Sequence, residues 1–223
     1  MHSNVKIAVS NVQHGTMKRS TAIDPLLVDE NRRAFLAETN IAPADAILVQ
    51  VDYDTNDFCR YQTVGKSAQG EGIVRAGRVA DALATQEKGV ALFLPLADCA
   101  GVVLHDVKQD ILLLSHLGRH SVEQYGAQKS VDYLVRTHGS RPQDIDAWIS
   151  PAAGAENYPL RAFEQKGLQA VICAQLASAG ITPTRIEIDE CDTTKDKSLF
   201  SHSEFKKGNR AEDGRFAVVA VLR

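Results

Sequence analysis

Seven short runs of apolar and β-branched residues, spread along most of the chain, set the strongest limit on its fold. Runs of about four to eight such residues between Gly, Pro, Asp or Lys are typical of buried β-strands, because buried helices need longer segments. The runs lie at residues 47–51, 90–95, 101–105, 111–115, 145–149, 185–189 and 216–222. The sequence therefore predicts a largely buried sheet structure.

Two of these runs, 101–105 and 111–115, are separated only by a short polar stretch that ends at Asp110. A connection of this length favours an antiparallel hairpin, because a parallel crossover needs a dozen or more residues. We therefore expect at least one antiparallel strand pair.

Three segments carry apolar residues at helical spacing: 29–38, 121–137 and 160–176. Ser121 is the expected N-cap of the second segment, with Gln124 three positions later completing a capping-box pattern. The sequence therefore predicts three helices.

Strands outnumber helices in this interpretation, and the hairpin argues against an all-parallel sheet. No Pro-, Ser- or Gly-rich linker divides the 223 residues, and a chain of this length can bury one substantial core. We expect an α/β fold of the α+β type, a single domain over residues 1–223 with mixed β-sheets covered by helices.

Charge and hydropathy argue against two classes of partner. The formal net charge is −3, with acids and bases interspersed, so the basic footprint of a nucleic-acid-binding protein is missing. The first residues lack the pattern of a signal peptide, and the longest apolar runs are far shorter than a bilayer span. We expect a cytoplasmic protein with no nucleic-acid or membrane partner.

The candidate chemistry lies at Cys99 and His116. Cys99 follows one predicted strand and precedes the hairpin, and His116 ends the second strand of that hairpin, so the two side chains are expected at one edge of the sheet. A thiolate and an imidazole serve as two zinc ligands or as a nucleophile–base pair. A small buried Cys and a hydrogen-bonded core His are the structural alternative.

Short motifs along the chain resemble those of the YfiH-type laccase-domain family, in the same order from about residue 8 to the end. The matching residues are Asn31-Arg32, 80–85, Ala97-Asp98-Cys99, His116-Leu117-Gly118, 150–154 with Tyr158, Cys191-Asp192-Thr193, Phe200-Ser201 and Gly214-Arg215. The family was long labelled polyphenol oxidases and is now understood as zinc-dependent purine nucleoside phosphorylases that also deaminate adenosine. The resemblance implies a monomer that acts on adenosine or inosine with phosphate.

The resemblance also implies one zinc ion, held in the family by His, Cys and His. The last two ligands map onto Cys99 and His116. The first maps onto Asp52, within Gln50-Val51-Asp52-Tyr53, where the family has Gln-Val-His-Gly. Because carboxylate oxygens also bind zinc, the expected metal ligands are Cys99, His116 and Asp52.

Six further residues receive roles from the resemblance and from their chemistry. Arg32 and Asn31 are expected beside the active site, and Asp98 is expected to orient a ligand. Arg119 and His120, where the family has Trp-Arg-Gly, are candidates to bind phosphate or ribose. Tyr158 is expected to face the base.

Two other functions stay open at this point. Without a metal, Cys99 as nucleophile, His116 as base and Asp98 as orienter would make a cysteine hydrolase, and folds of this type resemble the catalytic domain of a deamidating bacterial toxin. The missing first His and the altered motif after His116 would instead suit a divergent, inactive ligand-binding relative. A multicopper oxidase is disfavoured, because its site needs clustered histidines and the seven here are scattered.

Overall fold

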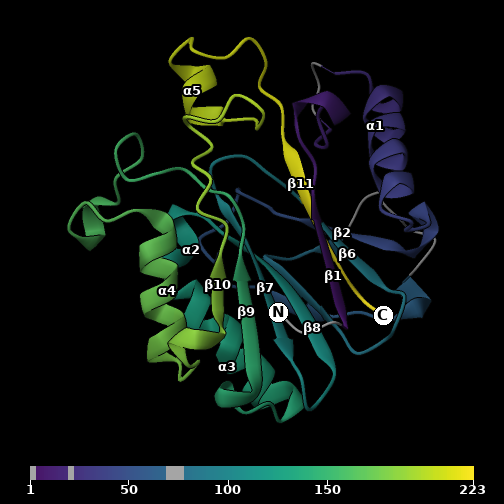
Figure 1. Ribbon diagram of the computed structural model, residues 1–223, viewed down its shortest axis with the longest axis vertical. Coiled ribbons are helices and arrows are strands. Elements are labelled where there is room, and N and C mark those ends of the chain that lie inside the picture. The colour runs from purple at the N-terminus through teal and green to yellow at the C-terminus, as the bar shows by residue number, and fades with distance from the viewer. Residues whose placement is uncertain (1–3, 20–22, 69–77) are drawn as a thin grey trace.

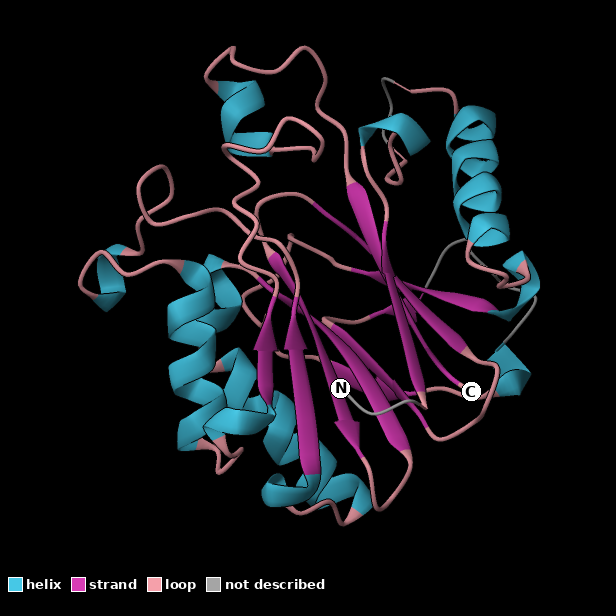
Figure 2. Ribbon diagram, in the orientation of Figure 1, coloured by secondary structure: helices cyan, strands magenta, loops and turns pink. Residues whose placement is uncertain are grey.

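Within the residues that the structure describes, 4–19, 23–68 and 78–223, the computed structural model has two β-sheets packed face to face (Figure 1). Helices cover the outer face of each sheet, so the layers run helix, sheet, sheet, helix (Figure 2). This arrangement buries both faces of both sheets.

Both sheets are mixed. The first has the order β1 (Val5–Val9), β11 (Phe216–Leu222), β6 (Ala91–Leu96), β2 (Ala46–Gln50), β4 (Arg78–Val79). The second has the order β10 (Ile186–Ile188), β9 (Ile145–Ile149), β7 (Ala100–Asp106), β8 (Ile111–Leu117), β5 (Ala82–Thr85), β3 (Tyr61–Thr63). In the first sheet β11 pairs antiparallel with β6 while β2 pairs parallel with β6, and the second sheet also combines both directions. The predicted α/β fold with mixed sheets is confirmed.

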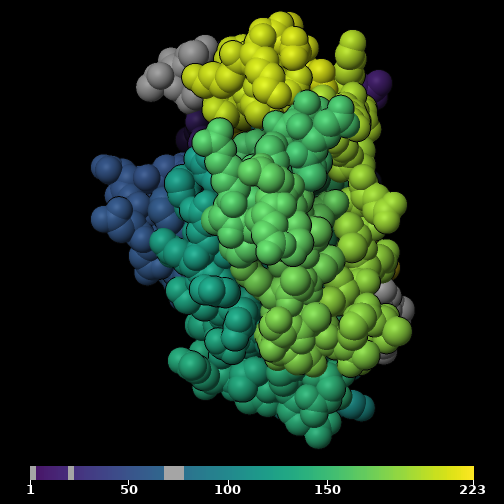
Figure 3. Space-filling view, turned by 90° about the vertical axis from the view of Figure 1, so that its left-hand side faces the viewer, coloured from purple at the N-terminus to yellow at the C-terminus, as the bar shows by residue number. Residues whose placement is uncertain are grey.

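One helix covers the first sheet and three cover the second. The helices are α1 (Pro25–Glu38) on the first sheet, α2 (Arg119–Glu123), α3 (Gly126–His138) and α4 (Leu168–Ser178) on the second, and α5 (His202–Lys206) before β11. Short 3-10 turns lie at Val12–His14, Pro43–Asp45, Lys66–Ala68, Pro142–Asp144, Arg161–Phe163 and Pro183–Arg185. The space-filling view shows the face formed by α4 and its neighbours in green, with the yellow segment that carries α5 above it (Figure 3). No helix in the described ranges is both long enough and apolar enough to cross a membrane.

The alternation of side chains along β8 shows why the apolar runs are continuous. Ile111 and Leu113 pack under the helices of the second sheet, whereas Leu112 and Leu114 pack against the first sheet. Successive side chains in a strand point to opposite faces, and here both faces are buried. A strand in this position therefore has no polar side.

All seven predicted strands are present, and β7 and β8 form the predicted antiparallel hairpin with Val103 opposite Leu114. The sequence analysis did not predict β1, β3, β4 or β5. Strands β3 and β4 are short edge strands. The Ala-Leu-Ala-Thr sequence of β5 has little intrinsic strand preference and is a strand because it pairs with both β3 and β8.

All three helix predictions were wrong at their N-terminal ends; the first helix begins at Pro25 rather than at residue 29. Tyr125, with a left-handed φ of 61°, separates α2 from α3, so residues 121–137 do not form one helix. Ser121 lies inside α2, and its hydroxyl accepts a hydrogen bond from the N–H of the true N-cap, Gly118, at 3.1 Å. The amide of Gln124 bonds to the 56–58 segment instead of capping a helix. The third predicted helix begins at Leu168 rather than 160, after a 3-10 turn.

The two-sided burial of β8 predicts a large loss of stability on truncation there. Leu113→Ala removes a fully buried side chain and should lower the free energy of unfolding by about 2–5 kcal/mol. Leu26→Ala, at a position that is 68% exposed, is the matched control and should change it by less than about 0.5 kcal/mol. Urea denaturation followed by circular dichroism measures both; equal losses would contradict the proposed layer order.

Candidate functional site

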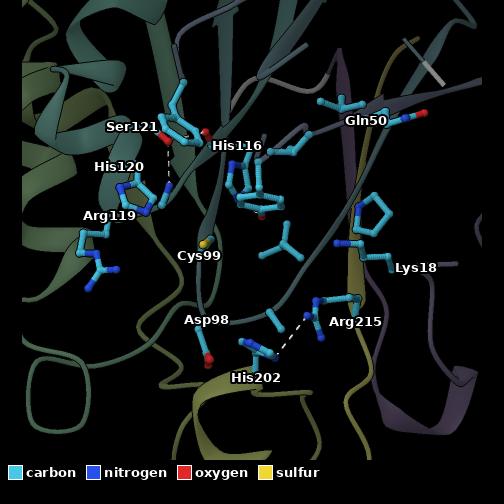
Figure 4. A pocket seen from close by; sticks show the side chains of 18 of the residues that line it. Lys18, Gln50, Asp98, Cys99, His116, Arg119, His120, Ser121, His202 and Arg215 are labelled. Carbon is cyan, nitrogen blue, oxygen red and sulfur yellow. Dashed lines mark hydrogen bonds between the residues drawn. The ribbon is translucent and has the colours of Figure 1, made fainter. Parts of the chain in front are cut away.

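A cavity of about 710 Å³ lies at the end of the sandwich opposite the β7–β8 turn. Its walls come from the ends of β2, β6 and β8, from the starts of α2 and α5, and from segments around Lys18, Tyr158 and Arg215. Cys99 and His116 lie between Arg119 and His120 on one side and Lys18 and Arg215 on the other (Figure 4). Residues from both sheets therefore meet in one site.

Cys99 and His116 are brought together, as the hairpin predicted. Cys99 lies in the tight link between β6 and β7, and His116 is opposite Gly101 in the β7–β8 pair. A Cβ atom placed on Gly118 would lie 2.7 Å from Cys99 Sγ and 3.5 Å from His116 Cε1. Gly118 thus leaves room for both side chains in the same wall.

Burial sets the protonation of this pair. Burial, helped by the charge of Asp98, raises the pKa of the Cys99 thiol to about 12. Burial also lowers the pKa of His116 to about 4, although the charge of Asp81 acts in the opposite direction. At neutral pH the thiol is protonated and the imidazole is neutral, so the pair is not a thiolate–imidazolium ion pair.

Tyr53, which the sequence analysis gave no role, is the side chain that approaches His116. Its hydroxyl lies 3.4 Å from His116 Nε2, and the two rings meet edge to face with centroids 6.0 Å apart. The Lys18 ammonium lies over the Tyr53 ring, 5.3 Å from its centroid. His116 Nδ1 is buried and has no hydrogen-bond partner among the described residues.

Asp52 does not join Cys99 and His116. Its Oδ1 accepts the N–H of Asp54 at 2.9 Å, and its Oδ2 is 3.5 Å from Arg60 Nη1. Arg60 is itself held by the buried Asp81 carboxylate at 2.8 Å. In this arrangement Asp52 lies outside the cavity wall, in contact with Arg60, and does not complete a ligand set with Cys99 and His116.

The predicted zinc does not fit the side chains as arranged. Catalytic zinc sites use three protein ligands and structural sites use four. In the described part of the chain, no three His, Cys, Asp or Glu side chains gather as a ligand set. Cys99 and His116 supply only two donors, and the position beside His116 Nε2 is held by a phenol.

Asp98, which is expected to orient a ligand, ties together the segments around Cys99 through its carboxylate. Its Oδ1 accepts the hydroxyl of Thr193 at 2.9 Å, and its Oδ2 accepts the N–H of Ser203 at 2.6 Å. Its backbone carbonyl accepts the N–H of Ala153 at 2.9 Å. Asp98 holds a left-handed φ of 70°, and these bonds fix that conformation next to Cys99.

Cationic side chains stand on both sides of the cavity. Arg215 donates to the Asp213 carboxylate at 2.6 Å and lies 3.4 Å from His202 Nδ1. Lys18 and Arg119 line the cavity and form no ion pair with another described residue. These two charges are therefore available to an anionic ligand.

Most of the other predicted site residues also line the cavity. The His120 ring stacks on Phe58 with centroids 4.9 Å apart, and Tyr158 lies in the same cavity wall. Arg32 donates from Nε to the Met17 carbonyl at 2.8 Å; burial and the neighbouring charge of Arg19 lower its pKa to about 10, so it stays charged at neutral pH.

Asn31 is the exception, because it does not line the cavity. Its amide donates to the Thr16 carbonyl at 3.1 Å and packs against Gly15, where a Cβ would lie 2.4 Å from Asn31 Nδ2. These contacts give Asn31 a structural role, and its binding role stays a prediction.

The sequence analysis missed several cavity residues. Arg215 had a signal, because it belongs to a Gly-Arg motif that resembles the family. Lys18, Phe58 and His202 had none, because they reach the cavity from three separate segments of the chain. Tyr53 had only its place in the motif Gln50-Val51-Asp52-Tyr53.

The hydrogen bonds of Asp98 predict a loss of stability on substitution that a control variant can separate from the effect of its backbone conformation. Asp98→Ala leaves the Ser203 N–H and the Thr193 hydroxyl without their acceptor, which should destabilise the fold by about 2 kcal/mol. Asp110→Ala is the matched control, since Asp110 also has a left-handed φ but is a partly exposed turn residue. Thermal and urea unfolding should show a larger loss of stability for Asp98→Ala than for Asp110→Ala. Equal losses would mean that the effect comes only from placing alanine at a left-handed φ, and not from the lost hydrogen bonds.

The raised pKa of Cys99 predicts slow alkylation. Because a raised thiol pKa favours the protonated form, the thiolate is scarce at pH 8, and iodoacetamide should label Cys99 roughly a thousandfold more slowly than free cysteine. The rate should still rise about tenfold per pH unit up to pH 10. Peptide mass spectrometry separates Cys99 from the other cysteines; fast labelling that levels off near pH 7 would contradict this protonation state.

Comparison with known proteins finds relatives in sequence and in fold. A purine nucleoside phosphorylase of Corynebacterium glutamicum is 26% identical over 199 residues, which cover 80% of this chain and 77% of that protein. The purine nucleoside phosphorylase of Deinococcus radiodurans is 30% identical over 137 residues, covering 60% of this chain and 48% of that protein. This chain thus aligns with about half the length of the second relative.

Solved structures share the fold. YlmD from Geobacillus stearothermophilus superposes with a TM-score of 0.86 at 21% identity, covering 99% of this chain and 93% of that one. The hypothetical protein YfiH from Bacillus licheniformis gives a TM-score of 0.80 at 23% identity, covering 93% and 85%. A family described as multi-copper polyphenol oxidoreductase laccase matches residues 8–169, well over half of the chain. This protein therefore belongs to that laccase-domain family, with the fold of YfiH and YlmD.

Proposed function

We propose that this protein catalyses the phosphorolysis of purine nucleosides: adenosine or inosine and phosphate become the free base and ribose 1-phosphate. The observation that carries the proposal is a single cavity in which unpaired cations and an aromatic wall flank Cys99 and His116. The named relatives, both purine nucleoside phosphorylases, support the same reaction.

The cationic side of the cavity suits phosphate. Lys18 and Arg119 have no carboxylate partner among the described residues, and Arg215 shares Asp213 with His202. Guanidinium and ammonium groups bind phosphate oxygens through charge-assisted hydrogen bonds. We assign phosphate to the space between these cations.

The aromatic side suits a purine. The stacked rings of Phe58 and His120, together with Tyr158, give flat apolar surface near the cations. Aromatic side chains favour stacked contacts with a planar ring. The ribose would then lie between base and phosphate, next to Cys99 and His116.

In the proposed step, a phosphate oxygen attacks the anomeric carbon and the bond from that carbon to the base nitrogen breaks. The base leaves with the electron pair of that bond and takes up the proton that hydrogen phosphate releases on becoming ribose 1-phosphate. The Cys99 thiol, protonated at neutral pH, is positioned as a hydrogen-bond donor to the leaving base, and the cations hold the attacking phosphate. No step is assigned to a metal.

The alternatives receive less support from the geometry. A cysteine hydrolase requires an activated thiolate and an oriented base. Burial opposes the Cys99 thiolate, and Asp98 bonds to Thr193 and Ser203 instead of His116. An inactive relative that binds an anion could use the same cations, and release of free base in the assay below separates it from an enzyme. Deamination of adenosine, which the resemblance also implies, would be detected as inosine in the same assay.

The phosphate assignment predicts a specific kinetic defect. Lys18→Ala and Arg119→Ala should raise the KM for phosphate about tenfold or more, since each removes a charged contact worth about 1.5 kcal/mol or more. Lys206→Ala, an exposed residue of α5 outside the cavity, changes the net charge equally and should leave the KM unchanged. Chromatography of free base from adenosine and inosine, with and without phosphate, measures these effects. No phosphate-dependent base release by the wild type would contradict the function.

A further inference from the structure

We propose that Tyr53 has taken the place of the third metal ligand, so that this protein holds Cys99 and His116 in a metal-free cluster with a phenol. The inference concerns metal content and does not depend on which reaction the cavity supports. It goes beyond the family resemblance, which implies a zinc site.

The position of Tyr53 carries the first step. A third ligand must lie near both Cys99 Sγ and a ring nitrogen of His116 to complete a tetrahedral site. The side chain beside His116 is Tyr53, with its hydroxyl 3.4 Å from Nε2 and its ring edge to face with the imidazole, and Tyr53 lines the same cavity as Cys99. A protonated phenol is a hydrogen-bond partner for a neutral imidazole and a poor zinc ligand at neutral pH.

The surroundings of Asp52 carry the second step. The Arg60 guanidinium contacts both the carboxylate and the backbone of Asp52. Its Nη2 donates a hydrogen bond to the Asp52 backbone carbonyl at 3.1 Å. The same guanidinium is bound to the buried carboxylate of Asp81. Because the Asp52 carbonyl is held on this side, its carboxylate points toward Arg60, and moving it to Cys99 would break these contacts.

The charge of the cavity carries the third step. Lys18, Arg119 and Arg215 all line the space in front of Cys99. A divalent cation placed there meets the charges of Lys18 and Arg119, whereas Arg215 is paired with Asp213 and the Asp98 carboxylate is occupied by Thr193 and Ser203. Of Cys99 and His116, only the thiol can become an anionic ligand. Cys99 and His116 are neutral or weakly charged donors, and they do not offset the repulsion between the metal ion and these cationic side chains.

The experiment is a measurement of zinc content in the whole chain. Purified wild type and Tyr53→Phe are dialysed against zinc and then against metal-free buffer, and the zinc is measured by mass spectrometry. We expect both proteins to retain well below about one-tenth of an equivalent. Retention of about one equivalent by the wild type, lost in Cys99→Ser, would overturn the proposal.

A gain-of-ligand variant tests the position of Tyr53 directly. Tyr53→His adds an imidazole beside Cys99 and His116 and should bind about one zinc, or one cobalt(II) with the absorption of a thiolate-bound tetrahedral ion. The double variant Tyr53→His with Cys99→Ser should lose that signal. Thermal unfolding confirms that each variant is folded. Failure of folded Tyr53→His to bind either metal would show that Tyr53 does not occupy the ligand position.

Zinc content and base release are measured separately, so the two proposals can fail independently. Base release by zinc-free wild type would support both proposals, and its absence would count against phosphorolysis without changing the zinc content. Base release that requires a stoichiometric, retained zinc would overturn the present inference alone.

Discussion

The apolar contact between the inner faces of the two sheets is the interaction on which the rest of the structure depends. Leu92 and Leu94 of β6 meet Leu112 and Leu114 of β8 across this layer. Because the helices bury the outer faces as well, polar side chains are left to the strand ends and loops. The cavity forms at one such end, where strands from both sheets finish together.

Long-range polar contacts then fix what faces the cavity. Asp98 ties the start of α5 and the Thr193 segment to the link that carries Cys99. Arg60 and Asp81 do the same on the other side, where they also hold the segment after β2. The orientation of the site is therefore set by two buried carboxylates, Asp98 in the cavity wall and Asp81 behind it.

The site combines the family's thiol and imidazole with groups of its own. Cys99 and His116 keep the relation that the resemblance predicts, but Tyr53, Lys18 and Arg119 give the cavity a phenol and unpaired positive charge. Such a cavity favours an anionic ligand and disfavours a bound cation. The proposed phosphorolysis and the proposed absence of a metal centre both follow from that balance of charge.

The sequence by itself determined the seven main strands, the β7–β8 hairpin and the meeting of Cys99 with His116, because periodicity and a short connection act within a few residues. Only the tertiary structure decided that Ala82–Thr85 is a strand and that Tyr53, not Asp52, reaches His116. The hydrogen bond between the Asp98 carboxylate and the Ser203 N–H likewise joins residues that are 105 positions apart in the sequence. These outcomes depend on contacts between distant segments, and no local spacing encodes them.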